Sequence, residues 1–189
     1  TNKDDGYIRM YTRESGQALT ERLQITTNGH LLLGTSTDYA DANSDDVQIY
    51  GTGHTGMSIT SGSSHFGSIY FGDATSGDAR NAGIIRYDHS VNAMEFWTNA
   101  GEKARIDSSG RLYLGATTGG NADTDDLVIN GSGKKGITIC STDGSESRLT
   151  FADGLSGVAA VAGNITYTHS IDSLDLYTAT TRRLRVDSS

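Results

Sequence analysis

Apolar and polar residues alternate with a period of two along most of this chain. The clearest stretch is Gly83–Gly115, GIIRYDHSVNAMEFWTNAGEKARIDSSGRLYLG, in which Ile85, Tyr87, Met94 and Phe96 fall on one side of the pattern. This alternation is typical of β-strands that bury one face of a sheet. The stretch therefore predicts four short strands joined by three tight turns, with the apolar row on the buried face.

The same pattern returns after 80 residues, as Gly163–Ser189, and a partial copy opens the chain at Gly6–Gly34. A fixed period of this size is typical of tandem structural modules. We divide the chain into residues 1–34, the C-terminal part of a preceding repeat; residues 35–116, a full β repeat; and residues 117–189, a second repeat truncated before its last strand. Since the pattern is cut at both ends, we expect a longer protein with further repeats.

Further strands are predicted in the first half of each repeat. They are Val47–Tyr50, Met57–Thr60 and Ser68–Gly72, with counterparts at Leu127–Asn130, Ile137–Cys140 and Arg148–Ala152. No stretch has the 3.6-residue period of a long amphipathic helix. The fold class predicted is all-β, with tandem β-hairpin or β-sandwich modules of about 80 residues in an elongated array.

Composition limits the functions open to this chain. The net charge of −8 disfavours nucleic-acid binding, and no apolar run approaches the length of a membrane span. The single cysteine, Cys140, excludes an intrachain disulfide. Because only 35% of the residues are hydrophobic, we expect stabilising contacts with neighbouring repeats or with identical chains.

Two glycine motifs resemble a nucleotide-binding pattern. Both Gly51–Gly56 and Gly131–Gly136 satisfy G-x-G-x-x-G. In a dinucleotide site this motif opens a helix, whereas here a predicted strand follows each copy. We therefore interpret the glycines as hairpin-turn residues.

Asp88, His89 and Ser90 place the residue types of a hydrolase triad side by side. Neighbouring side chains on a strand point to opposite faces, so these three cannot form a triad. The second repeat also has Thr168 in place of Asp88. His169 repeats His89, which favours a hydrogen-bonded turn histidine over a metal ligand shared between chains. We predict no enzymatic activity, no catalytic residue and no cofactor-binding residue.

The polar linkers contain the metal candidates. Both follow the spacing D/N-x-D/N-x-D that begins an oxygen-ligand calcium loop. The candidate ligands are Asp41, Asn43 and Asp45 in the first linker and Asn121, Asp123 and Asp125 in the second. The twelfth positions, Thr52 and Ser132, lack the glutamate of an EF-hand, so the prediction is a simpler calcium site. The alternative is a solvated connector rich in turns.

The central block resembles the repeats of tailed-bacteriophage tail fibres, in the shaft region that precedes an endosialidase-type intramolecular chaperone domain. The residues that carry the resemblance are Gly83, Ile85, Tyr87, His89, Ser90, Met94, Phe96, Thr98, Asn99, Arg105, Ile106, Asp107, Ser108, Ser109, Gly110, Arg111, Leu112, Leu114 and Gly115. The second copy keeps Gly163, Ile165, Tyr167, His169, Ser170, Thr178, Arg185, Asp187, Ser188 and Ser189, and departs at Leu174, Leu176, Ala179 and Val186.

The resemblance implies a parallel homotrimer that forms a rigid, non-enzymatic shaft and positions a receptor-binding tip. It implies two identical chains and neighbouring fibre segments as partners, and a location in the virion tail fibre, extracellular when assembled, without membrane insertion. One alternative is a module that binds a host-surface glycan through the loops Asp73–Ala82 and Asp153–Ala162, or through aromatic residues such as Trp97. Another is a repeat filament or adhesin of a bacterial cell.

Overall fold

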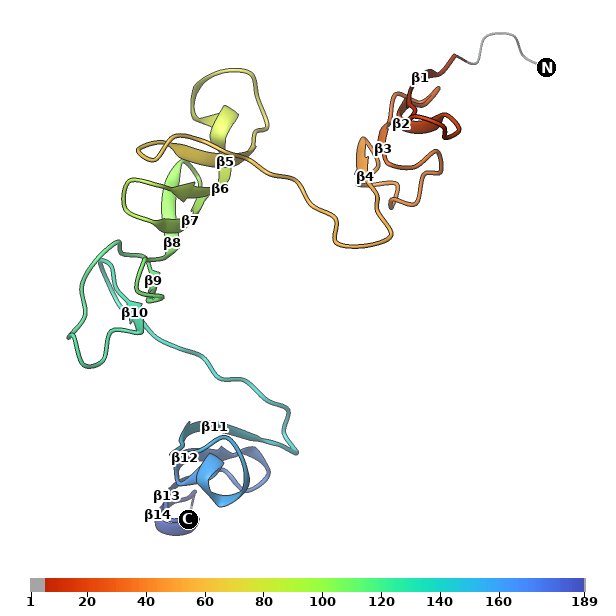
Figure 1. The fold of residues 1–189 in the computed structure, drawn as a ribbon. Helices are drawn as coiled ribbons and strands as arrows, with labels where there is room; N and C mark the ends of the chain where they lie inside the picture. The colour runs from red at the N-terminus through yellow and green to blue at the C-terminus, as the bar shows by residue number, and fades with distance from the viewer. Residues whose placement is uncertain (1–5, 189) are drawn as a thin grey trace. The chain divides into compact units, whose positions relative to one another are not determined.

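The computed structural model describes residues 6–188, and these residues form an all-β fold with three short 3-10 helices (Figure 1). The predicted all-β class is therefore confirmed. Residues 1–5 and Ser189 lie outside the described part. No helix within residues 6–188 has the length and apolar character needed to cross a membrane. The chain divides into two compact units, Thr1–Gly110 and Arg111–Ser189. The boundaries assigned to the repeats from the sequence stay a prediction.

The first sheet contains four strands in the order β1-β2-β3-β4. They are β1 (Ile8–Thr12), β2 (Thr20–Ile25), β3 (Leu31–Leu33) and β4 (Val47–Ile49). The turn before β3 is tight, with Gly29 at φ 91°, as the Asn28-Gly29 pair favours. β3 and β4 are parallel, and Leu32 lies opposite Gln48. Residues 35–46 form the crossover between these two strands.

The next four strands form an antiparallel meander. They are β5 (Phe66–Phe71), β6 (Gly83–Asp88), β7 (Ala93–Thr98) and β8 (Gly101–Ile106). The register places Ile85 between Ile69 and Phe96. Asn99 and Ala100 both have positive φ and join β7 to β8, as in a two-residue hairpin turn. The 3-10 helix η1 (Gly77–Asn81) lies between β5 and β6.

The second unit repeats these elements. β9 (Leu112–Leu114) and β10 (Leu127–Ile129) are parallel, like β3 and β4. The second meander consists of β11 (Glu146–Phe151), β12 (Gly163–Thr168), β13 (Ser173–Thr178) and β14 (Thr181–Val186). Two 3-10 helices flank β12, η2 (Gly157–Val161) and η3 (His169–Ile171). The four strands predicted in Gly83–Gly115 are confirmed as β6, β7, β8 and β9.

Two predicted strands are absent from the described residues. Met57–Thr60 and Ile137–Cys140 pair with no strand in residues 6–188, so the hairpins predicted over Gly51–Gly56 and Gly131–Gly136 are wrong. Alternation alone does not make a strand, because a strand also needs a hydrogen-bonded neighbour. These two segments have no neighbouring strand to bond with in residues 6–188. Their side chains are also exposed, with Met57 at 64% and Ile137 at 68%.

The buried residues lie on the face opposite the predicted one. The buried apolar side chains are Leu32, Ile84, Ala93, Tyr113 and Val128, and the buried polar ones are Gln24, Glu95, Thr166, Ser173 and Asp175. In contrast, Ile85, Phe96 and Leu176 of the predicted row are 39%, 40% and 37% exposed. The prediction that this row is buried is therefore wrong for the single chain. A period of two separates the faces of a strand but does not say which face other residues cover.

Candidate functional site

The first candidate site is an apolar surface that recurs on both meanders. We call it the apolar face. On the first meander it consists of Ile69, Phe71, Ile85, Tyr87, Met94, Phe96, Ala104 and Ile106, and on the second of Leu149, Phe151, Ile165, Tyr167, Leu174, Leu176, Leu184 and Val186. Cross-strand register sets these side chains beside one another. Contiguous exposed apolar surface of this kind marks an interaction site.

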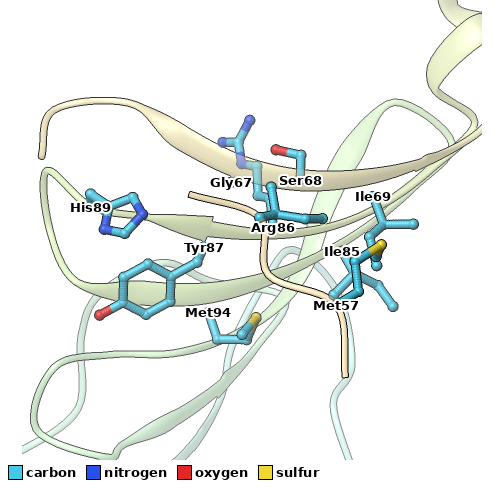
Figure 2. A pocket seen from close by; sticks show the side chains of 10 residues that line it. Met57, Gly67, Ser68, Ile69, Ile85, Arg86, Tyr87, His89 and Met94 are labelled. Carbon is cyan, nitrogen blue, oxygen red and sulfur yellow. The ribbon is translucent and has the colours of Figure 1, made fainter. Parts of the chain in front are cut away.

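One of the unpaired segments reaches the apolar face. Met57 and Ile59 line a hollow of about 350 Å³ together with Ile69, Ile85 and Met94. Figure 2 shows Met57 close to Ile69 and Ile85, with Met94 below them. The extended segment thus adds its own apolar side chains to the surface but leaves most of that surface uncovered.

The two recurrent histidines lie at the end of the apolar face. The His89 ring stands 4.9 Å from the Tyr87 ring, edge to face, and the His169 ring stands 5.0 Å from the Tyr167 ring. His169 Nε2 also lies 3.1 Å from the Ser147 hydroxyl. Neither histidine belongs to a group of three metal-ligating side chains in the described residues. These contacts agree with a turn histidine held by its neighbours.

The opposite face of the first meander is built on a buried carboxylate. Glu95 is 1% exposed and accepts hydrogen bonds from Arg86 Nε at 2.7 Å, Arg105 Nη2 at 2.5 Å and Trp97 Nε1 at 3.0 Å. The Arg86 guanidinium lies 4.3 Å from the centre of the Trp97 ring and 4.1 Å from that of Phe66. Trp97 is therefore held by Arg86 and Glu95 within the chain, and glycan binding through it stays a prediction.

The second meander has a smaller version of this arrangement. Asp175 is fully buried and accepts hydrogen bonds from Arg185 Nε at 2.8 Å and Nη2 at 2.7 Å. Hydrogen bonding to Arg185 lowers the pKa of the Asp175 carboxyl, since it favours the charged form. Thr166 replaces Arg86 here, and its hydroxyl donates to Asn164 Oδ1 at 2.6 Å.

In the first linker, two of the predicted calcium ligands, Asp41 and Asn43, bond to each other, and the third, Asp45, lies beside His30. Asp41 Oδ1 accepts hydrogen bonds from the backbone and side-chain amides of Asn43, at 3.0 and 2.9 Å, and these bonds lower the pKa of Asp41. Asp45 lies near His30, with 3.6 Å between Oδ2 and Nδ1. The first linker therefore shows an Asx turn followed by a carboxylate that lies beside an imidazole.

The second linker follows the same scheme. Asn121 Oδ1 accepts the backbone N–H of Asp123 at 3.0 Å, and Arg111 Nη1 donates to Asp125 Oδ2 at 2.6 Å. Calcium binding by these two triplets stays a prediction.

A cluster that the sequence reasoning missed lies where the first linker returns to the sheet. His30 Nδ1 is 3.0 Å from Asp38 Oδ2, and one ligand atom each from His30, Asp38 and Asp45 lie within 4.8 Å of one another. Hydrogen bonding to Asp38 raises the pKa of His30, and the same bond lowers the pKa of Asp38. The parallel pairing of β3 with β4 brings residue 30 beside residue 45, and that pairing was not predicted.

Comparison of the sequence with protein-family models and with curated proteins finds no match. The geometry of the two faces and of the linkers is therefore the basis for assigning a role.

Proposed function

We propose that this chain is a structural segment of the shaft of a homotrimeric phage tail fibre. In this role it has no enzymatic activity. It packs against two identical chains, joins neighbouring fibre segments and holds a host-receptor-binding tip away from the virion. Its location is the tail fibre of the virion, outside the cell when assembled.

The observation that carries the proposal is the exposure of the apolar face in both repeats. The same row is exposed at the same register, with Ile69 at 41% and Ile106 at 42% in the first repeat and Leu149 at 50% in the second. Covering a half-exposed aliphatic side chain contributes roughly 1 kcal/mol. Because the row recurs along the chain, covering it would stabilise an assembly at each repeat. This favours an association between identical chains that extends over several repeats.

Open backbone edges support the same proposal. β5 has a pairing partner on one side only, and β11 and β14 are the outer strands of the second meander. Met57–Thr60 and Ile137–Cys140 are extended and have no strand partner in residues 6–188. Unpaired edges favour pairing with another chain, and assembly of identical chains covers them.

The threefold order rests on the resemblance of the repeats to tail-fibre shafts. Sedimentation equilibrium of the purified chain tests it, with an expected mass three times the 20.0 kDa of one chain. A single species at 20.0 kDa across the micromolar range would remove the basis of the proposal. Antibodies against the chain should label virion tails, whereas labelling of uninfected bacterial cells would favour the bacterial filament.

A further inference from the structure

The cluster formed by His30, Asp38 and Asp45 has the chemistry of a metal site, and none of its three residues belongs to the apolar face. We propose that these three side chains bind one divalent transition-metal ion, for which zinc is the representative. The inference concerns the linker of the first repeat and does not depend on whether the chain forms a trimer.

The distances from His30 Nδ1 to the two carboxylates are close to the spacing of ligand atoms around one metal ion. Nitrogen and oxygen ligands lie about 2.1 Å from zinc, so two ligand atoms in a tetrahedral site are about 3.4 Å apart. The His30 Nδ1 atom is 3.0 Å from Asp38 Oδ2 and 3.6 Å from Asp45 Oδ2. The three ligand atoms all lie within 4.8 Å of one another, so the two carboxylates draw together when they share one ion, and water completes the coordination.

The surrounding backbone holds these side chains in place. Asp38 Oδ1 accepts the Ala40 N–H at 3.0 Å, which leaves Oδ2 directed at His30. The linker is tied to β4 because the Tyr39 N–H donates to Gln48 Oε1 at 2.7 Å. The side chains of His30, Asp38 and Asp45 are 17%, 34% and 22% exposed, so an ion can reach them while water is partly excluded.

The second linker, together with Arg111 just before β9, provides an internal comparison. Counting from the following strand, Arg111 stands where His30 stands, and its guanidinium pairs with Asp125, the counterpart of Asp45. Counted forward from the end of the preceding strand, Leu33 of β3 or Leu114 of β9, Gly119 occupies the place of Asp38. The second linker thus carries a permanent cation and one carboxylate fewer.

The first linker lacks that permanent cation and has an additional carboxylate. The carboxylates of Asp38 and Asp45 carry two negative charges. A protonated His30 offsets only one of them, whereas a divalent ion offsets both. An imidazole ligand favours zinc and its transition-metal neighbours over calcium, which prefers oxygen ligands alone. The proposed site shares Asp45 with the predicted calcium triplet but uses neither Asp41 nor Asn43.

Isothermal titration of the metal-free chain with zinc chloride near neutral pH tests the proposal. The expected result is one ion bound per chain. Two variants copy the second repeat, His30→Arg and Asp38→Gly, and each should weaken zinc binding at least tenfold. Asp41→Asn is the matched control because it removes a carboxylate of the same linker, and its zinc affinity should equal that of the wild type.

Cobalt is a second probe of the same residues. Cobalt(II) should give visible absorption bands in the wild type and in Asp41→Asn, and these bands should be missing in His30→Arg. Circular dichroism confirms that each variant is folded, and Asp38→Gly serves as the test if His30→Arg fails to fold. Absence of zinc binding to the wild type overturns the proposal. Binding that survives in both His30→Arg and Asp38→Gly, or that is lost in Asp41→Asn, also overturns it.

Discussion

Glu95 and Asp175 occupy equivalent positions 80 residues apart, and both carboxylates are buried on the face opposite the apolar row, at 1% and 0% exposure. Each is held by the arginine ten residues further along, Arg105 in the first repeat and Arg185 in the second. A buried carboxylate without its arginine is strongly unfavourable. These pairs therefore keep one face of each meander closed within the chain and leave the apolar face to the outside.

Replacing Glu95 with glutamine should destabilise the first meander strongly. The change leaves Arg86 and Arg105 partly buried without the carboxylate between them, and the expected loss is about 3 kcal/mol in the free energy of unfolding. Urea unfolding followed by circular dichroism measures this loss. The control is Glu146→Gln, which removes the exposed pair with Arg148 and should cost less than about 1 kcal/mol. Equal losses in the two variants would contradict the prediction.

Acid should destabilise the second meander through Asp175. Because Arg185 lowers the pKa of Asp175 in the folded chain, the stabilising contribution is complete above the ordinary carboxyl pKa of about 4. It is lost as the pH falls through the lowered value. Urea unfolding at a series of pH values should show stability declining below about pH 4, and Asp175→Asn should make that decline shallower. The double variant Asp175→Asn/Arg185→Gln should have the same slope as Asp175→Asn. Identical slopes in wild type and Asp175→Asn would refute the assignment.

A charge on the apolar face should weaken association between chains. Phe96→Asp places a carboxylate at a position that is 40% exposed in the single chain and covered in the proposed assembly. The expected result is a shift of the mass measured by light scattering toward 20.0 kDa, with the circular dichroism spectrum retained. Val91→Asp is the control, because Val91 is 51% exposed in the turn between β6 and β7 and outside the apolar row. If both variants keep the wild-type mass, the apolar face is not the interface.

Gly115→Ala should be more destabilising than Gly110→Ala. Both glycines have positive φ, at 77° and 84°, so each alanine costs about 1 kcal/mol in backbone strain. A Cβ at Gly115 also collides with the carbonyl oxygen of Asn130, whereas at Gly110 it meets nothing within 4 Å. The collision affects the link between β9 and β10, in which the Asn130 N–H donates to Leu114 at 3.0 Å. Thermal unfolding compares the two variants, and a larger loss in Gly110→Ala would contradict this account.

Some buried residues that the sequence analysis did not place in the core could have been predicted from the sequence. Leu31–Leu33, Leu112–Leu114 and Leu127–Ile129 are unbroken apolar triplets, so each strand has apolar side chains on both of its faces. Their central residues include Leu32, Tyr113 and Val128, which are buried. The site at His30 had no comparable signal. It depends on a parallel pairing across a crossover, and local alternation carries no information about that pairing.

The sequence by itself determined the approximate positions of the strands that pair in the two meanders, their repetition after 80 residues and the separation of each meander into an apolar and a polar face. It also suggested two strands, Met57–Thr60 and Ile137–Cys140, that do not form. These features follow from local periodicity and turn chemistry, as Asn28-Gly29 shows before β3. Tertiary structure decided which face is covered, which segments remain unpaired and which side chains meet at His30. Burial and pairing depend on contacts between residues far apart in the chain. Arginines can close a polar face over Glu95, while Ile85 and Phe96 on the other face stay exposed.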